Sequence, residues 1–348
     1  MVIMLLTLLS MALRAISSPT SFHVRSGSNS MENLVTFGDS YTDENRFNYF
    51  AQHHAAPPIG EMLPPSNNTW SGGYAWGRLV ANATGANYYN YAVAGAMCTN
   101  NFDSRDLDAI NGPFPSVLEY EIPAFEQDIR YPGLYPSRRP DNTVYALWIG
   151  TNDLGIVGIL ADKQKAGTTI TTYVDCIWTV LDRIYSAGGR HFVLLNQAPL
   201  ERAPLYATPE SGGQGDTPGW SNKTAYNTTE YANKVLQYTT SVNTMYDYGG
   251  PMFLLAKRRW PGASVSLFDT HSLIMDVINC PASYLDAPAD VVAPFRTCLF
   301  NGCVDSKHPR SSFLWFDELH TSERMQEILS KNFIDVVQGK SKYGTYYK

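Results

Sequence analysis

Near its amino terminus the chain reads Asn33-Leu-Val-Thr-Phe37, followed directly by Gly38-Asp39-Ser40-Tyr41. The short run of apolar and β-branched residues predicts a buried strand, and the glycine permits a tight turn into the next element. Ligands of open α/β sheets bind outside the carboxyl ends of the strands. Ser40 is therefore expected at the edge of a site, as a candidate nucleophile. The same pattern also fits a helix cap, in which Asp39 or Ser40 starts the following helix.

Further along the chain, short apolar runs alternate with helical patterns, which is typical of a parallel α/β sheet. Four more strands are predicted, at Tyr88–Val93, Val144–Ile149, His191–Leu195 and Val265–Phe268. Apolar residues at helical spacing predict helices at Thr169–Ala187, at Asn233–Tyr248 and from about Thr321 to Val337. The segment Glu201–Thr229 is rich in Pro, Gly, Ser, Thr and Asn, and it predicts a long surface excursion.

Two residues that suit acyl transfer follow the next two predicted strands. Gly95 has no side chain, so its N–H can approach a developing oxyanion closely, although it is equally an ordinary turn glycine. Asn152 could donate its side-chain amide to the same oxyanion, a contact worth roughly 3 to 4 kcal/mol in the transition state. The alternative for Asn152 is an Asx turn that opens a helix. The neighbouring Asp153 is expected to be structural.

A candidate general base lies near the carboxyl terminus, in Asp317-Glu-Leu-His320. Three-residue spacing on a turn lets a carboxylate reach Nδ1 of the histidine and fix its tautomer, while Nε2 faces the nucleophile. The alternative is that His320 merely lies at the start of a helix and that Asp317 caps it. The convergence of a nucleophile, two oxyanion donors and a base on strand ends favours a serine hydrolase. Neither the G-x-S-x-G elbow nor a His…Asp…Ser order is present.

These motifs resemble, in order, the four blocks of the SGNH/GDSL hydrolase family. The matching positions are Gly38-Asp39-Ser40, Gly95, Gly150-x-Asn152-Asp153 and Asp317-x-x-His320. The resemblance implies a three-layer α/β/α sandwich around a central parallel sheet, of flavodoxin-like type. It also implies that Ser40 is nucleophile and first oxyanion donor, that Gly95 and Asn152 are the other donors, and that His320 is a base partnered by Asp317. No metal and no organic cofactor is expected.

Tyr41 stands where the family's literal motif has leucine. Phe37–Asp43 together with Gly95–Cys98 looks more like the fungal secreted branch similar to carbohydrate esterase family 16 acetylesterases. This resemblance implies hydrolysis of short-chain acyl esters through an acyl-enzyme, with acetyl groups on plant-cell-wall oligosaccharides as the expected substrate. The alternatives are a lipase or phospholipase on the same residues and a catalytically silent carbohydrate-binding protein.

Two further segments bear on the substrate. The apolar run Leu154–Leu160 follows Asn152 and could line an acyl pocket, or it could be the buried start of a helix. Within the polar excursion, three aromatic residues could pack against sugar rings: Tyr206, Trp220 and Tyr226.

The amino-terminal sequence and the sequons predict a secreted protein. The apolar run Met1–Leu13 is too short to span a bilayer, and Ala15-Ile16-Ser17 supplies small residues for cleavage, so residues 1–17 are expected to be a signal peptide and 18–348 a single hydrolase domain. Glycan acceptor sequons lie at Asn67, Asn82, Asn222 and Asn227. The net charge of -6 argues against a nucleic-acid partner, and no later segment has the roughly 20 apolar residues of a membrane helix.

The chain has five cysteines, at positions 98, 176, 280, 298 and 303. None shows the paired spacing of a zinc site. Cys280, Cys298 and Cys303 cluster in a loop-like stretch, which predicts a disulfide among them whose connectivity stays open. The odd count leaves at least one thiol unpaired within the monomer.

Overall fold

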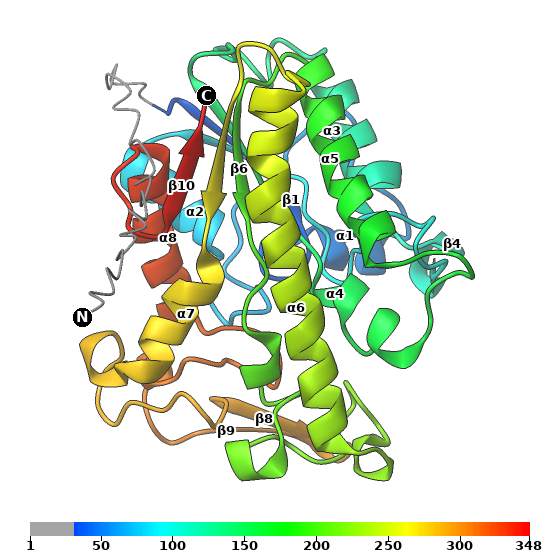
Figure 1. Cartoon of the computed structure of the whole chain (residues 1–348), viewed down its shortest axis with the longest axis vertical. Helices are drawn as coiled ribbons and strands as arrows, with labels where there is room; N and C mark the ends of the chain where they lie inside the picture. Colours follow the sequence, from blue (N-terminus) through cyan, green and yellow to red (C-terminus); the bar gives the residue numbers. More distant parts are fainter. Residues whose placement is uncertain (1–30) are drawn as a thin grey trace, which may run out of the picture.

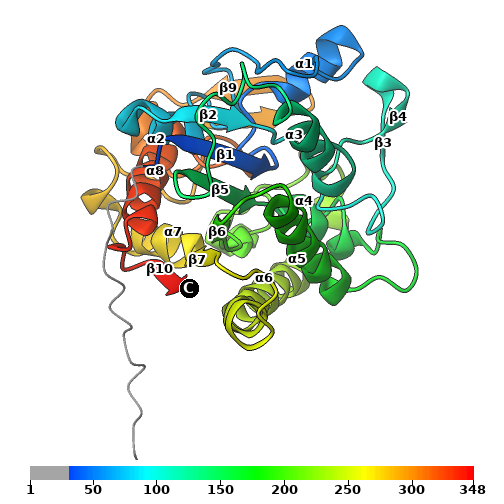
Figure 2. The same ribbon diagram turned by 90° about the horizontal axis from the view of Figure 1, so that it is seen from above.

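The computed structural model describes residues 31–348. The strands of its central sheet are β1 (Asn33–Gly38), β2 (Asn87–Asn90), β5 (Thr143–Trp148), β6 (His191–Leu195), β7 (Ser264–Phe268) and β10 (Gly344–Tyr347). They lie in the order β10-β7-β6-β5-β1-β2. Figure 1 shows β10, β6 and β1 of this sheet, and Figure 2 shows all six strands from above. Every neighbouring pair is parallel except β10 and β7, which are antiparallel.

Helices cover both faces of this sheet and give the protein three layers (Figure 2). One face packs against α3 (Ile122–Asp128), α5 (Ile170–Ser186) and α6 (Thr228–Pro251). The other packs against α2 (Trp76–Thr84), α7 (Thr270–Asn279) and α8 (Glu323–Val337). Successive strand residues point to opposite faces, so Val35 lies in the first core and Leu34 in the second. The predicted α/β/α sandwich is confirmed.

The remaining elements are short and lie mostly at the ends of strands. Helices α1 (Arg46–His53) and α4 (Thr151–Leu154) follow β1 and β5. Two small hairpins pair β3 (Asp106–Leu107) with β4 (Gly112–Pro113) and β8 (Arg296–Leu299) with β9 (Gly302–Asp305). No helix formed by residues 31–348 is long and apolar enough to cross a membrane. The predicted signal peptide, residues 1–17, lies outside the described residues.

Several predicted element boundaries shift for local reasons. The strand predicted at Tyr88–Val93 ends at Asn90, because Oδ1 of Asn90 accepts the N–H of Ala92 and turns the chain. Helix α6 begins earlier than predicted, since the Asn227 side chain caps it by accepting the N–H of Glu230 at 3.2 Å. The antiparallel strand β10 was not predicted, because its sequence, Gly-Thr-Tyr-Tyr, is too short to show a pattern.

Two expectations about apolar loop residues are corrected. Within Glu201–Thr229, the rings of Tyr206 and Trp220 are buried in the core on the α2–α8 side, and only Tyr226 is exposed. The first two therefore cannot pack against a sugar. In the run that follows Asn152, Leu154 and Leu160 are buried core residues. Leu154 is the last residue of α4, so the run follows this helix and does not start it.

The structure contains two disulfides. Cys298–Cys303 joins β8 to β9, so the predicted bond within the carboxyl-terminal cluster is confirmed, and Cys280 is free and exposed. The second bond, Cys98–Cys176, links residues 78 positions apart, and no local pattern had indicated it.

Candidate active site

The strand ends that lead to the predicted site residues lie side by side, because β1 pairs with β2 on one side and with β5 on the other (Figure 2). Gly38, the last residue of β1, has a φ of +147°, and a Cβ there would lie 2.1 Å from the carbonyl oxygen of Trp148. Only glycine fits this junction. The N-cap of α1 is Asn45, so Asp39 and Ser40 belong to the turn and do not cap the helix.

A continuous chain of hydrogen bonds joins Ser40, His320 and Asp317. Oγ of Ser40 lies 2.8 Å from Nε2 of His320, and Nδ1 of this ring lies 2.8 Å from Oδ2 of Asp317. Oδ1 of Asp317 also accepts the backbone N–H groups of Leu319 and His320, at 2.9 and 2.7 Å. These bonds close a turn ahead of α8, whose N-cap is Ser322. The Asp-x-x-His spacing itself thus brings the carboxylate to the ring.

The electrostatics of the pair favour a protonated imidazole beside a carboxylate. Burial lowers the pKa of His320, but the charge of Asp317 and its hydrogen bond outweigh burial and hold the pKa above the ordinary 6.5. Burial raises the pKa of Asp317, yet His320 and the two backbone N–H groups hold it below the ordinary 3.8. The ring can therefore take up a proton while its partner stays ionised.

Three candidate donors for an oxyanion lie around Ser40. Among the described residues, the backbone N–H groups of Ser40 and Gly95 have no hydrogen-bond acceptor. Gly95 has a φ of +85°, and a Cβ there would lie 2.8 Å from Cζ of Phe114. Asn152 uses one amide hydrogen to bond the carbonyl oxygen of Ala96 at 2.9 Å. This bond ties Asn152 to the Gly95 turn and leaves its second amide hydrogen for a ligand.

Two buried carboxyl groups lie behind the site. Oδ1 of Asp39 accepts the N–H of Tyr41, and Oδ1 of Asp153 accepts the N–H of Cys98, each at 3.0 Å. Burial raises the pKa of both groups to about 7. The contact of Asp153 holds the loop after Gly95 against α4, in line with the structural role expected from the sequence.

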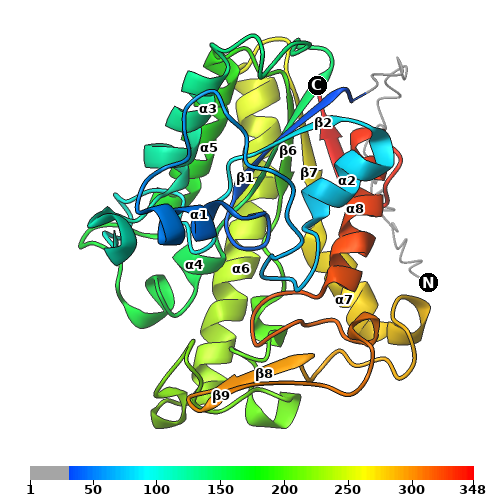
Figure 3. The same cartoon turned by 180° about the vertical axis from the view of Figure 1, so that it is seen from behind.

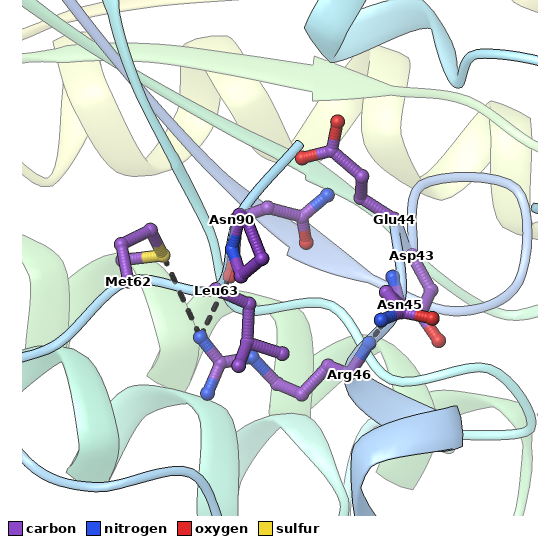
Figure 4. A pocket seen from close by; sticks show the side chains of 8 residues that line it. Asp43, Glu44, Asn45, Arg46, Met62, Leu63 and Asn90 are labelled. Carbon is purple, nitrogen blue, oxygen red and sulfur yellow. Dashed lines mark hydrogen bonds between the residues drawn. The ribbon is translucent and has the colours of Figure 1, made fainter. Parts of the chain in front are cut away.

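Asp43, which the sequence did not single out, joins the start of α1 to the Gly95 loop. Its carboxylate accepts the N–H groups of Arg46 and Phe47 from the helix and that of Ala94 from the loop, at 2.7, 3.1 and 2.9 Å. The Arg46 guanidinium donates to the carbonyl oxygen of Asn90 at 2.8 Å. Asp43, Arg46 and Asn90 line a cavity of about 10 Å³, which is the size of one water molecule (Figure 4). The spacing of Asp43 before a helix is an N-cap signal that could have revealed it.

Glu121 is a second residue that sequence reasoning missed. It is fully buried, and its carboxylate accepts the N–H of Gly38 at 2.9 Å and the N–H of Val93 at 3.2 Å. Burial raises the pKa of Glu121 well above its ordinary value, against the effect of these donors and of Arg46. The side chain thus bridges the chain segments that lead into Ser40 and Gly95.

The chain is similar to known proteins over most of its length. Residues 34–333 match the family model described as GDSL-like Lipase/Acylhydrolase. The chain is 51% identical over 318 residues to an acetylesterase from Hypocrea jecorina, covering 90% of this chain and 91% of the relative. It is 28% identical to an acetylesterase from Thermothelomyces thermophilus, covering 92% and 93%.

Among solved structures, an acetyl xylan esterase from Geobacillus stearothermophilus matches with a TM-score of 0.40 and 14% identity, over 90% of this chain and 97% of the other. The family assignment rests on the sequence matches, which span most of the chain. The chain belongs to the GDSL-like lipase/acylhydrolase family and is a carboxylic ester hydrolase.

Proposed function

We propose that this protein is a secreted serine esterase that removes short acyl groups, acetyl above all, from carbohydrate hydroxyls. The observation that carries the proposal is the hydrogen-bond chain from Ser40 through His320 to Asp317, beside two backbone N–H groups without acceptors. The name of the Hypocrea jecorina relative supports acetyl as the acyl group.

In the proposed reaction, Oγ of Ser40 attacks the ester carbonyl carbon while its proton passes to Nε2 of His320. The carbonyl π electrons move onto oxygen, which the N–H groups of Ser40 and Gly95 and the free amide hydrogen of Asn152 would stabilise. Collapse breaks the bond to the alcohol oxygen, which takes the proton from His320 and leaves an acyl-enzyme.

Water then completes the cycle. The oxygen of a water molecule attacks the acyl carbon while Nε2 of His320 takes a proton from that water. When the bond to Oγ of Ser40 breaks, His320 returns the proton to Oγ and the carboxylic acid leaves. The partly buried Asp317 would stabilise the imidazolium in both half-reactions. The proposed steps invoke no metal and no organic cofactor.

Secretion is part of the proposal and has independent support. The asparagines of all four sequons are exposed: Asn67, Asn82, Asn222 and Asn227. Two disulfides also fit an oxidising compartment. We expect peptide mapping of the secreted protein to find glycans at these positions and a new amino terminus near residue 18.

A second candidate function, hydrolysis at a lipid surface, is favoured by one observation. The β8–β9 hairpin exposes Leu299, Phe300 and Val304, which are 47%, 66% and 73% exposed. The hairpin joins the segment before Asp317, because the N–H of Arg296 donates to the carbonyl oxygen of Phe316 at 2.7 Å (Figure 3). An apolar patch beside an esterase site is a feature that lipases share.

Labelling and substitution test the proposed mechanism. A serine-directed phosphonate should modify Ser40 alone, as read by mass spectrometry of peptides. Ser40→Ala and His320→Ala should each reduce kcat on a small acetate ester by at least about 10⁴-fold while circular dichroism stays unchanged. Modification at another serine, or near-normal turnover by Ser40→Ala, would end the serine-esterase hypothesis.

A further inference from the structure

A tryptophan that the proposed chemistry does not use lies directly on the imidazole of His320. The ring centroids of Trp70 and His320 are 5.3 Å apart, with 35° between the ring planes. Trp70 nevertheless remains 39% exposed, whereas His320 is only 9% exposed. A large aromatic side chain with one free face, beside a reacting group, is an available contact surface for a substrate.

The turn that carries Trp70 is fixed in place. The N–H of Gly72 donates to the carbonyl oxygen of Thr69 at 3.1 Å, and Oγ1 of Thr69 donates to the carbonyl oxygen of Gly73 at 2.6 Å. A Cβ on Gly72 would lie 2.2 Å from the ring of Phe316, so the turn packs closely against the segment that precedes Asp317. These contacts hold the Trp70 turn against the segment that leads to Asp317 and His320.

Two phenylalanines extend this surface toward the oxyanion donors. The ring of Phe47 lies 6.2 Å from Trp70, and the ring of Phe114 stacks 6.2 Å from Phe47 at 18°. Phe114 in turn occupies the space over Gly95 that a Cβ would fill. We call Trp70, Phe47 and Phe114 the aromatic wall. It runs from the general base at one end to a candidate oxyanion donor at the other.

The order of groups along the aromatic wall indicates which part of an ester meets each end. The alcohol oxygen must take its proton from Nε2 of His320, so it lies within hydrogen-bond distance of that atom when the bond breaks. The carbonyl oxygen lies toward Gly95 instead. Trp70 packs on the His320 ring, and the alcohol part of the substrate therefore lies next to the indole.

We infer that Trp70 determines specificity for the alcohol, and that its exposed face binds the ring of a saccharide. The negative face of an aromatic ring attracts C–H groups, which a sugar ring presents on its apolar face while its hydroxyls stay in water. This inference rests on the proposed function, because it names the residue through which that function would select a carbohydrate. An acyl chain would lie on the far side of the carbonyl carbon, away from Trp70.

The test compares an ester that has a sugar ring with one that has none. We would measure kcat and KM for acetylated xylobiose and for ethyl acetate with the full secreted chain, its Trp70→Ala and Trp70→Phe variants and a Tyr248→Ala control. Tyr248 is an exposed aromatic residue near the end of α6. In Trp70→Ala, the ratio of kcat/KM for the sugar acetate to kcat/KM for ethyl acetate should fall about tenfold, mainly through KM. Trp70→Phe should restore most of the ratio, and Tyr248→Ala should not change it.

Every other outcome contradicts either this inference or the proposed function on which it rests. An unchanged ratio in Trp70→Ala, or an equal loss on both substrates, would mean that the indole only supports His320. A loss larger on ethyl acetate than on the sugar acetate would also contradict a contact between Trp70 and the sugar. If Trp70→Ala does not fold, as judged by its melting temperature, the ratio for Trp70→Leu decides the question in its place. If the unmodified protein hydrolysed neither acetylated xylobiose nor ethyl acetate, the proposed function itself would be contradicted.

Discussion

At the scale of single residues, the charge on Asp317 decides the pH at which His320 can work. Burial lowers the pKa of the imidazole, and the adjacent Asp317 carboxylate makes the largest of the opposing contributions, which with the charges of Asp39 and Glu318 hold the pKa above 6.5. A general base acts in its neutral form. Activity should therefore rise with pH through the raised pKa of His320 and be lost below it.

The Asp317→Asn variant tests this account. Removing the negative charge while burial remains should lower the pKa of His320, so the acid limb of the kcat/KM profile should move to lower pH. The maximal rate should also fall, but the loss should be about a hundred times smaller than the loss in His320→Ala, because the oxyanion donors and the base persist. The measurement is kcat/KM between about pH 4 and pH 9. An unmoved limb with full activity would show that Asp317 only shapes the turn and that the working unit is a Ser–His dyad.

At the scale of elements, the loops after β1 and β2 are held together by a buried carboxylate on the segment that enters α3. Glu121 accepts one backbone N–H from Gly38 and one from Val93. The Val93 N–H is shared, because it also donates to the carbonyl oxygen of Gly38 at 3.1 Å. A buried donor that loses its acceptor altogether costs about 1 to 3 kcal/mol. The positions of Ser40 and Gly95 thus depend on a side chain that touches neither substrate nor general base.

Glu121→Gln should therefore reduce both stability and rate. Glutamine keeps one acceptor oxygen, but its NH₂ group would face a backbone N–H, so we expect a loss of roughly 1 to 3 kcal/mol in urea unfolding and a lower kcat. The matched control is Glu126→Gln in α3, directly after Glu121 in the chain. It removes only a partly exposed ion pair with Arg183 and should cost about 0 to 1 kcal/mol. Equal effects of the two variants would contradict a bridging role for Glu121.

The two disulfides should differ in their contribution to stability. Cys98–Cys176 is buried and closes a loop with a sequence separation of 78, whereas Cys298–Cys303 has a separation of 5 within a surface hairpin. Loop-closure entropy gives about 4 to 5 kcal/mol for the first and about 2 kcal/mol for the second. The larger drop in melting temperature is expected for the double serine variant at 98 and 176. That variant should also lose activity, since Cys98 follows the Gly95 turn. A larger drop for the pair at 298 and 303 would refute this ranking.

At the scale of the whole molecule, the surface around the site bears on acyl-chain length. The segment Glu201–Thr229 is polar on its outer side and buries Tyr206 and Trp220, so it makes a poor lid for a lipid surface. The exposed apolar residues of the β8–β9 hairpin are the opposing feature. Rates on a series of p-nitrophenyl esters of increasing acyl-chain length show which of the two features determines the preferred chain length.

We expect turnover to fall steeply from acetyl to butyryl and to be negligible on octanoyl esters, with no activation by a lipid interface. The relevant measurements are kcat/KM across the series and the rate on emulsified substrate. Equal or rising rates on octanoyl esters would favour the lipase alternative. In that case Phe300→Ser should lower the rate on the emulsion while leaving hydrolysis of soluble acetate intact.

The local features of this protein could be predicted because each depends on residues that are close in the chain. An apolar run ending in glycine encodes a buried strand and a turn, which placed Ser40 at the sheet edge. The Asp317 carboxylate reaches the N–H and the ring of His320 because the two residues are only three positions apart and lie on one turn. Alternating strands and helices likewise gave a parallel sheet, since a crossover connection requires them.

Other features were decided only by the tertiary structure, because their partners are far apart in sequence and no period or spacing relates them. Glu121 has no sequence signal, as a glutamate near a helix start usually faces solvent, and only packing buries it under Gly38. The contact between Trp70 and His320 also has no sequence signal, because the two residues are 250 positions apart in the chain. Trp220 stands in a polar loop, yet the hydrophobic effect draws its ring into the core. Local sequence specifies which groups can react, and long-range burial specifies what surrounds them.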